Sequence, residues 1–305
     1  MHLDQFTSYL KDTDKSPRTI DGYTRDLQTF ITWYKGSTGQ PPSAATVTPL
    51  DVREYRQYLS VTKRLKPAGV NRKLAALRAY FNWARQAKLI STSPVAGIKG
   101  VKQVARAPRW LDRRQVYALL NAATAAIQVA EARGLSAGAA TAKRNAAILS
   151  LLLNAGLRVS ELCALHLDDV TLNDRSGLVV VRSGKGGKYR EVPLNKDARQ
   201  KLRDWLAVRQ SDSENLFFGR RNDVLQPRGV QRVVSELATA ARLDVDMVTP
   251  HALRHTFGKN LVDAGVPLDR VAMLMGHSNL NTTAIYTRPS GADLAAAVDR
   301  IAWAD

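Results

Sequence analysis

One short segment limits the fold of this chain more than any other: residues 177–194, GLVVVRSGKGGKYREVPL. Two runs rich in β-branched residues flank a Gly-Lys-Gly-Gly turn, which predicts a β-hairpin. In most of the remaining chain the apolar residues recur at helical spacing, and no repeat of solenoid or propeller length is present. We therefore predict a mainly α-helical protein with one small β-sheet or hairpin.

The first part of the chain carries clear signals for helix starts. Pro17, Pro49 and Pro67 each occupy a plausible first helical position, and the first two follow a capping hydroxyl. After Pro17 and Pro67 the apolar residues follow at helical spacing. These patterns predict a small helical domain over residues 1–96.

The helical pattern stops in GIKGVKQVARAPR, which contains two glycines, a proline and several basic residues. This composition predicts a basic linker over residues 97–109. Helical patterns then resume, so residues 110–305 form the second predicted domain, which includes the hairpin. Within it, the alanine-rich stretch 121–142 is interrupted by Gly134 and Gly138, and it fits a helix, a loop or a longer helix.

Positive charge is concentrated in one part of the sequence. The formal net charge is +18, and residues 52–106 hold 13 basic residues against the single acidic residue Glu54. Solvated faces usually mix the two signs, so this excess favours a polyanionic partner, and nucleic acid in particular. Asn71, Arg78 and Arg85 are spaced by seven residues and share one helix face. The candidate DNA-binding residues are Arg72, Arg78, Arg85, Lys99, Lys102 and Arg106.

The composition also restricts the compartment. The chain contains no apolar run of about 18 residues, and its start, MHLDQFTSYL, does not resemble a signal peptide. Cys163 is the only cysteine, which excludes an internal disulfide and favours a reducing environment. We expect a cytoplasmic protein without membrane contact, in which Cys163 is a buried structural residue.

Residues suited to chemistry gather in the segment TPHALRHTF. Thr249 caps a helix that begins at Pro250, so His251 and Arg254 lie on one face. His251 and His255 have the spacing of a zinc-binding helix, but an arginine lies between them and no further ligand cluster accompanies them. No metal site is therefore expected, and the GKGGK turn lacks the pattern of a nucleotide-binding loop.

Five motifs follow one another through the second domain: GLRVSEL, GKGGKYREVPL, HALRH, MGHS and TAIYTR. In residue type, order and spacing they resemble the tyrosine recombinase, or phage integrase, family. The resemblance covers nearly the whole chain, because the first domain is similar to the core-binding domain of that family. The candidate catalytic residues carried by these motifs are Arg158, Lys185, His251, Arg254, His277 and Tyr286.

The resemblance implies both a fold and a reaction. It implies a helical core-binding domain that clamps DNA, followed by a mixed α/β catalytic domain. It also implies an Xer-like or transposon-borne site-specific recombinase that acts through a 3′-phosphotyrosyl intermediate and a Holliday junction, without metal or ATP. The implied partners are double-stranded DNA with inverted-repeat sites and three further protomers in a tetrameric synapse. The resemblance also implies a bacterial-type protein that is associated with the nucleoid. Its partners would include a second recombinase or an accessory protein.

Physical chemistry explains why these residue types belong together. The guanidiniums of Arg158 and Arg254 can hold the non-bridging oxygens of a phosphodiester and offset the charge that attack adds. The phenol of Tyr286, with a pKa near about 10, needs help to lose its proton and is the expected nucleophile. His251 is the expected base or hydrogen-bond partner, and His277 is expected to bind the phosphate.

Further residues have expected supporting roles. Lys185 resembles the general acid of the family, and Lys188 is a neighbour that could be confused with it. Glu161 lies one helical turn from Arg158 and is placed to orient it. His255 is expected to form structural hydrogen bonds near the site.

Two other classes of protein use similar residues or the same fold. A type IB topoisomerase has similar chemistry but relaxes DNA without a particular site, and a non-catalytic DNA-binding protein could keep the fold. The tail after Tyr286 predicts an amphipathic helix with Leu294, Val298 and Ile301 in line. That helix would pack on a neighbouring protomer, as in the family, or on its own chain. The target DNA and the biological role are left open.

Overall fold

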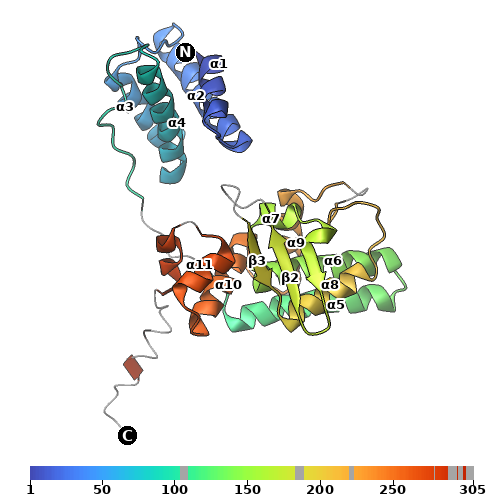
Figure 1. Cartoon of the computed structure of the whole chain (residues 1–305). Coiled ribbons are helices and arrows are strands. Elements are labelled where there is room, and N and C mark those ends of the chain that lie inside the picture. The colour runs from blue at the N-terminus through green and yellow to red at the C-terminus, as the bar shows by residue number, and fades with distance from the viewer. Residues whose placement is uncertain are drawn as a thin grey trace. The chain divides into compact units, whose positions relative to one another are not determined.

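The computed structural model describes residues 1–103, 109–182, 189–219, 223–277 and 279–287, together with 294 and 298–299. The chain divides into two compact units, Met1–Arg106 and Ala107–Asp305 (Figure 1). Each unit has a hydrophobic core of its own. The boundary between the units, after Arg106, lies within the segment 97–109 that the sequence analysis described as a linker.

Helices account for the regular structure of the first unit. Pro17, Pro49 and Pro67 are each the first residue of a helix, which confirms the start signals. The Ser16 side chain accepts a hydrogen bond from the Thr19 backbone nitrogen and so caps the second helix. The elements are α1 (Leu3–Asp12), α2 (Pro17–Thr38), α3 (Pro49–Gln57), the π-helix η1 (Tyr58–Thr62) and α4 (Pro67–Gln86).

A segment after α4 packs back onto this helix. Ile98 is buried in the core of the first unit. The Asn71 side-chain amide accepts from the Val101 backbone nitrogen at 2.8 Å and donates to the Val101 carbonyl at 2.9 Å, and Arg78 donates to the Ile98 carbonyl at 2.6 Å. The first unit therefore extends past residue 96, where the sequence analysis placed its end. The difference arises because polar side chains of α4 satisfy main-chain groups of a segment that has no periodic pattern.

One buried carboxylate joins α2 to α4. Asp26 on α2 is only 2% exposed and pairs with Arg72, and it accepts a second hydrogen bond from Lys73 Nζ at 2.9 Å. A buried charge is tolerated when it is paired in this way. Asp26 thereby fixes the first turns of α4, where two of the unit's cations lie.

The second unit combines helices with a small sheet. The alanine-rich stretch forms parts of two adjacent helices, α5 and α6, and the turn between them contains Gly134 with φ of +66°. Glycine is favoured in this left-handed conformation. The longer helices are α5 (Arg113–Ala132), α6 (Ser136–Asn154), α8 (Lys196–Leu206), α9 (Pro227–Ala240), α10 (Pro250–Asp263) and α11 (Leu268–Met275). The shorter ones are α7 (Val159–Cys163), η2 (Leu167–Asp169), η4 (Leu280–Thr282) and η5 (Ala284–Thr287).

The sheet of the second unit has three antiparallel strands in the order β1-β2-β3, with bounds Val170–Leu172, Gly177–Val181 and Arg190–Pro193. Strands β2 and β3 are the predicted hairpin, and the buried Val179 and Val192 face one another across it. The turn that joins them, residues 183–188, lies outside the described residues. The sequence analysis missed β1, because a strand of three residues is too short to show an alternating pattern.

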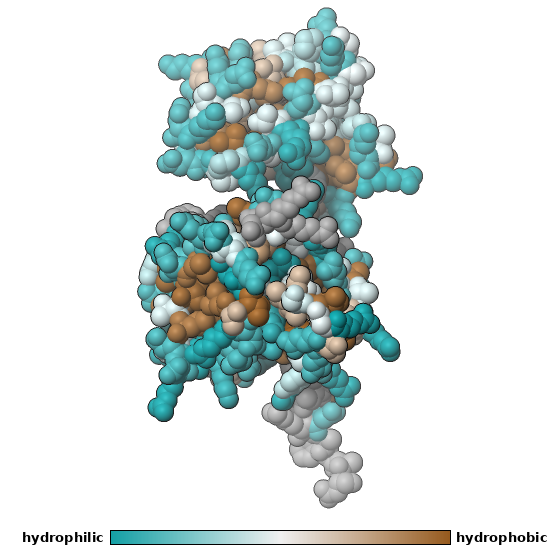
Figure 2. Space-filling view, turned by 90° about the vertical axis from the view of Figure 1, so that its right-hand side faces the viewer, coloured by the Kyte–Doolittle hydropathy of each residue, from teal (hydrophilic) through white to brown (hydrophobic). Residues whose placement is uncertain are grey.

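Aromatic residues of the first unit pack in its core. Tyr80 and Trp83 are buried, and the half-buried Trp33 lies 5.0 Å from Tyr55 between ring centroids. In the second unit Cys163 is also buried, as predicted. The face shown in Figure 2 is mostly hydrophilic, with separate hydrophobic areas on each unit. Within the described part of the chain, no helix has the length and apolar character needed to span a membrane.

Candidate active site

Helix α10 carries the most deeply buried cation of the site. Thr249 caps the helix by accepting from the Ala252 backbone nitrogen, and Pro250 is its first residue. One turn later Arg254 is only 4% exposed, and its guanidinium donates to the carbonyls of Gly156 and Met275. Its charge therefore lies at a fixed place inside the unit.

Arg158 brings a second, more accessible guanidinium to the same place. It is the N-cap of α7, and its side chain retains 31% of its exposure. Its Nη1 donates to Glu161 Oε1 at 2.6 Å, and its Nη2 donates to the Gly276 carbonyl at 2.9 Å. The predicted contact between Glu161 and Arg158 is present.

Glu161 contacts a third arginine that the sequence analysis missed. Arg190 on β3 donates to both carboxylate oxygens of Glu161, at 3.0 and 2.7 Å, and to the Leu274 carbonyl at 2.9 Å. Burial alone would raise the pKa of Glu161, but the hydrogen bonds from Arg190 and from the Arg158 backbone lower it to about 2. Glu161 is therefore ionised at neutral pH and holds the cations in place.

The carboxyl end of α11 is where these cations converge. Its carbonyls of Leu274, Met275 and Gly276 each accept a hydrogen bond from a different arginine of the site. Carbonyls at a helix end have no partner within the helix and carry partial negative charge, so guanidiniums are favourable there. Gly276 has φ of +62° and ends the helix, which places His277 directly beside the cluster. His277 Nδ1 lies 2.9 Å from Thr283 Oγ1.

Tyr286 belongs to a small hydrophobic cluster between α10 and α11. Its side chain is 1% exposed and packs with Phe257, Val271 and Met275. A Cβ atom at Gly258 would lie 2.7 Å from the Tyr286 ring, so glycine is needed for this close approach. Burial raises the pKa of Tyr286 to about 12. The phenol is therefore protonated in this structure at neutral pH.

The phenol oxygen contacts His255 and not His251. It lies 2.8 Å from His255 Nδ1, while His255 Nε2 lies 2.9 Å from His251 Nε2. The sequence analysis assigned the tyrosine contact to His251 and a structural role to His255. Helical spacing places both imidazoles on one side of α10, but it cannot show which of them faces a residue 31 positions later.

The histidines of the site are neutral at neutral pH, so arginines supply its positive charge. Burial and the nearby Arg254 lower the pKa of His277 to about 4. Burial lowers the pKa of His255 to about 4, and the nearby Arg254 adds to this effect. Burial lowers the pKa of Arg254 itself to about 10, which leaves this guanidinium protonated. The arrangement suits an anion with several oxygen atoms.

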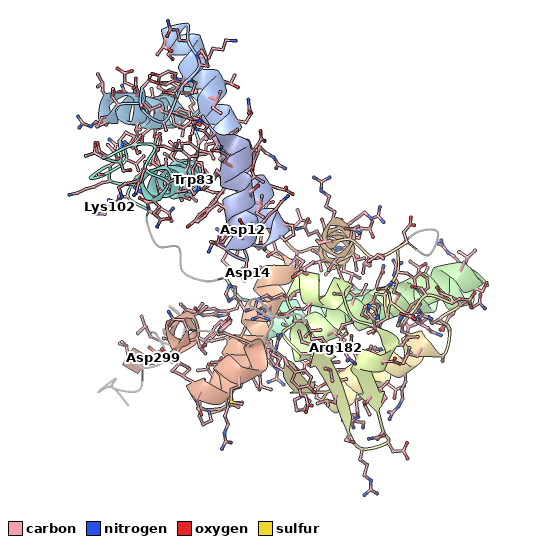
Figure 3. All side chains as sticks on the ribbon, turned by 45° about the horizontal axis from the view of Figure 1, so that its top comes forward. Asp12, Asp14, Trp83, Lys102, Arg182 and Asp299 are labelled. Carbon is pink, nitrogen blue, oxygen red and sulfur yellow. The ribbon has the colours of Figure 1, made fainter. Side chains whose placement is uncertain are left out.

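Several predicted site residues are placed elsewhere or are not described. Lys185, Lys188 and Arg106 lie outside the described residues. In the first unit, Arg78 is half-buried against the 98–101 segment, whereas the other candidates are exposed. Arg72 is 56% exposed in its side chain although it pairs with Asp26. The remaining exposed candidates are Arg85, Lys99 and Lys102, the last of which is labelled in Figure 3.

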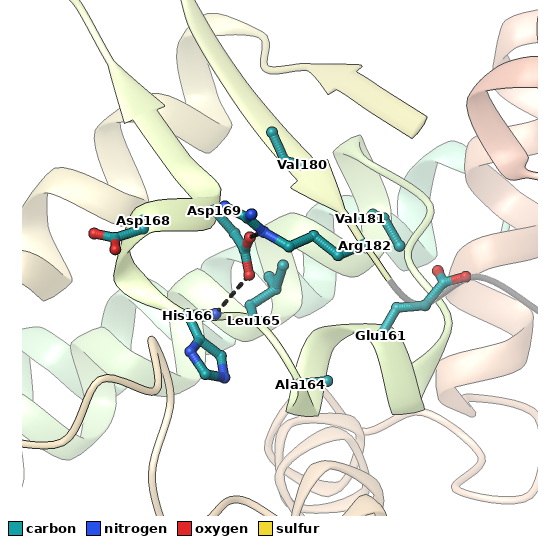
Figure 4. Close-up of a pocket in the computed structure, with 9 residues that line it drawn as sticks. All are labelled: Glu161, Ala164, Leu165, His166, Asp168, Asp169, Val180, Val181 and Arg182. Carbon is teal, nitrogen blue, oxygen red and sulfur yellow. Dashed lines mark hydrogen bonds and ion pairs between the residues drawn. The ribbon is translucent and has the colours of Figure 1, made fainter. Parts of the chain in front are cut away.

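A hollow of about 360 Å³ opens on the other side of Glu161, between η2 and β2 (Figure 4). Arg182 crosses it to pair with the buried Asp169, and Asp168 lies at its edge. With three carboxylates against one guanidinium, this hollow does not suit a phosphate. The arginine cluster at α11 is the better candidate for an anionic substrate.

Comparisons with known proteins show the family of the chain. Residues 109–292 match the phage integrase family, and residues 2–90 match the phage integrase N-terminal SAM-like domain. The chain is 33% identical over 294 residues to the tyrosine recombinase XerC of Xanthomonas axonopodis pv. citri (strain 306), covering 93% of this chain and 91% of that protein. It is 32% identical over 294 residues to the tyrosine recombinase XerC of Neisseria meningitidis serogroup C (strain 053442), covering 94% and 90%.

Solved structures share the fold. The XerH site-specific recombinase bound to a palindromic difH substrate gives a TM-score of 0.72 at 23% identity, over 92% of this chain and 79% of that one. A lambda integrase dimer bound to a COC′ core site gives a TM-score of 0.70 at 19% identity, over 95% of each chain.

The family matches cover both units of the chain and define its class, which is that of enzymes that transfer DNA strands. More specifically, the chain belongs to the phage integrase family and is an Xer-like tyrosine recombinase, an enzyme of site-specific DNA recombination. The expectations for family, fold class and enzyme class are confirmed.

Proposed function

We propose that this recombinase cuts and rejoins DNA through a 3′-phosphotyrosyl intermediate at Tyr286 and passes through a Holliday junction. One observation carries the proposal. Arg158, Arg254, His277 and Tyr286, which come from separate segments of the chain, meet around the carboxyl end of α11. Such a cluster combines a phosphate-binding charge with a nucleophile.

The two arginines act on the phosphate. Each holds a main-chain carbonyl with part of its guanidinium, which fixes the direction of the remaining N–H groups. A preorganised donor of this kind stabilises charge that develops on non-bridging oxygens during attack, and it does so without reorganisation. His277, which is neutral, adds a further hydrogen bond to the phosphate.

The reaction exchanges one ester for another. Tyr286 Oη forms a bond to phosphorus while the bond from phosphorus to the 5′-oxygen breaks, and the departing oxygen takes a proton. By family resemblance the proton comes from Lys185, on the turn between β2 and β3. Attack by the 5′-hydroxyl of a partner strand then releases the phenol, so the bond energy is conserved.

The proposal extends to the DNA and to the assembly. A structural relative is XerH on a palindromic substrate, and we propose that this chain likewise uses sites with inverted repeats. Four protomers would bring two such sites together, alone or with a second recombinase or an accessory protein. The first unit would bind the duplex through its exposed cations: Arg72, Arg85, Lys99 and Lys102.

The test uses duplexes that the protein selects from a random-sequence pool, each with a nick beside the cleavage position so that the cut cannot be resealed. Wild-type protein should form a covalent protein–DNA adduct that survives a denaturing gel. Tyr286→Phe should form none, because the ring is kept but the nucleophile is lost. Its DNA affinity should stay within about twofold of wild type.

Tyr189→Phe is the matched control, because this exposed tyrosine lies outside the cluster. It should form the adduct at the wild-type level. An adduct that persists in Tyr286→Phe would reject Tyr286 as the nucleophile.

A further inference from the structure

A chain of hydrogen bonds leads from the nucleophile towards solvent. The Tyr286 oxygen lies 2.8 Å from His255 Nδ1, and His255 Nε2 lies 2.9 Å from His251 Nε2. Tyr286 is buried, His255 is half-buried and His251 is exposed. The three side chains are therefore ordered from the interior of the second unit to its surface.

The distance between the two imidazoles fixes how many protons they share. Two bare ring nitrogens 2.9 Å apart would repel one another, and two N–H groups would collide, so one proton lies between them. If that proton is on His255 Nε2, then His255 Nδ1 is bare and accepts from the phenol. If it is on His251 Nε2, then His255 Nδ1 carries a proton and donates to the tyrosine oxygen.

We propose that His255 and His251 form a two-histidine proton relay for the Tyr286 phenol, with His255 as a catalytic residue. The inference rests on the proposed function of Tyr286. As the phenol oxygen bonds to phosphorus, its proton moves to His255 Nδ1. At the same time the Nε2 proton of His255 moves to His251 Nε2. His255 ends neutral, and His251 ends as an imidazolium exposed to solvent.

The surroundings explain why one histidine would not suffice. Burial and the charge of the nearby Arg254 disfavour a cation at His255. A relay never leaves His255 with a net charge, because it loses one proton as it gains another. The charge is placed on the exposed His251, which water can reach. Burial of part of the ring and the charges of Arg254 and Arg158 lower the pKa of His251 as well, so its imidazolium passes the proton readily to solvent. During rejoining, the same protons move in the opposite direction.

The first test needs no variant. The substrate is a duplex whose 5′-bridging oxygen at the cleavage position is sulfur, a leaving group that requires no proton. Single-turnover cleavage is then measured in mixtures of H₂O and D₂O. Two protons moving together give a bowed dependence of the rate on the deuterium fraction, whereas one proton gives a straight line. A straight line for the wild-type protein would overturn the relay.

The second test is a double-variant cycle. His255→Asn keeps a polar group near the phenol but cannot accept its proton, so it should slow cleavage of the sulfur substrate about 10²–10⁴-fold. His251→Asn should slow it as well. Because a relay acts as a unit, the double variant should be no slower than the slower single variant. Losses that multiply would show independent roles and reject the relay.

Controls separate folding and the proposed function from the relay. His166→Asn, at an exposed histidine outside the cluster, should cleave at the wild-type rate. Thermal melting and DNA binding of each variant check that it is folded. An adduct in Tyr286→Phe would reject the proposed function itself. Adduct formation that depends on Tyr286 but is as fast in His255→Asn as in wild type would reject only the relay.

Discussion

Glu161 is the residue on which the charge balance of the active site depends. It is 5% exposed and accepts hydrogen bonds from the side chains of Arg158 and Arg190, and Arg254 lies 3.8 Å away. Removing one partner of a buried ion pair is costly, because the other charge is left uncompensated. Three buried or half-buried guanidiniums would share that cost here.

We predict that Glu161→Gln lowers the free energy of unfolding of the second unit by about 3 kcal/mol near pH 7. The pKa of Glu161 is about 2 in the folded protein, below the ordinary value of 4.5. Its stabilising effect is therefore complete above about pH 4.5 and is lost as the pH falls towards 2. The difference between variant and wild type should narrow over that range.

Urea unfolding at pH 7 and at pH 3 measures this difference. Glu214→Gln is the control, because the Glu214 side chain is 88% exposed and should affect stability little at either pH. A Glu161→Gln protein as stable as wild type at pH 7 would contradict the role given to this carboxylate.

At the scale of residues, the sequence predicted some of the contacts in the site and missed others. Glu161 and Arg158 are three positions apart, so their contact follows from local geometry. Arg190 was missed because its partner Glu161 lies 29 positions earlier, on α7, and only tertiary packing brings α7 and β3 to the same end of α11. The same limit explains why the sequence analysis assigned the contact with the Tyr286 phenol to His251 and not to His255.

At the scale of elements, the sequence predicted the helices and strands whose positions are set by residues close to them in the chain. Prolines and capping side chains mark the starts of α2 and α3, and β-branched runs mark β2 and β3. The strand β1 pairs with the neighbouring β2 but has only three residues, and the path of residues 98–101 along α4 depends on contacts with Asn71, 30 positions earlier. Neither segment has a periodic sequence pattern from which it could have been predicted.

The turn between α6 and α7 offers a test of packing at this scale. Gly156 has φ of +57°, and a Cβ there would lie 2.2 Å from Phe257 Cδ1. Gly156→Ala should therefore combine backbone strain with overpacking and cost about 3 kcal/mol in the free energy of unfolding. Gly265→Ala is a matched control, because Gly265 has φ of +78° but open space around it.

The control should cost only about 1 kcal/mol, from the backbone alone. Chemical denaturation of the two variants gives the comparison. Equal losses would mean that Phe257 moves aside freely and that the contact imposes little constraint.

At the scale of the whole molecule, the charge distribution predicted which part of the chain binds the DNA backbone. Most of the excess positive charge falls in the first unit, Met1–Arg106. Composition could show this concentration but not which cations remain free for DNA. The structure separates Arg78, whose guanidinium donates to the Ile98 carbonyl, from the exposed Arg85.

We predict that loss of Arg85 weakens DNA binding, whereas loss of Arg78 destabilises the first unit. Arg85→Ala should reduce the slope of log affinity against log salt by about one, because one phosphate contact is lost, and should leave thermal melting unchanged. Arg78→Ala should lower the free energy of unfolding of the first unit by about 1 kcal/mol through the lost hydrogen bond. DNA titrations at several salt concentrations and thermal melting measure both, and an unchanged slope in Arg85→Ala would remove it from the DNA face.

Three arginines donate hydrogen bonds to the last carbonyls of α11, and these bonds have one further consequence. Main-chain oxygens are the same in every amino acid, so these hydrogen bonds do not depend on the side chains of Leu274 and Met275. Gly276 must remain glycine, because it has a positive φ and a Cβ there would lie 2.8 Å from Arg190 Nη1. The helix cannot, however, change its length. One inserted or deleted residue would rotate the carbonyls by about 100° and turn them away from their donors. We therefore expect relatives to differ in the residue types at positions 274 and 275 and to have the same number of residues in this helix.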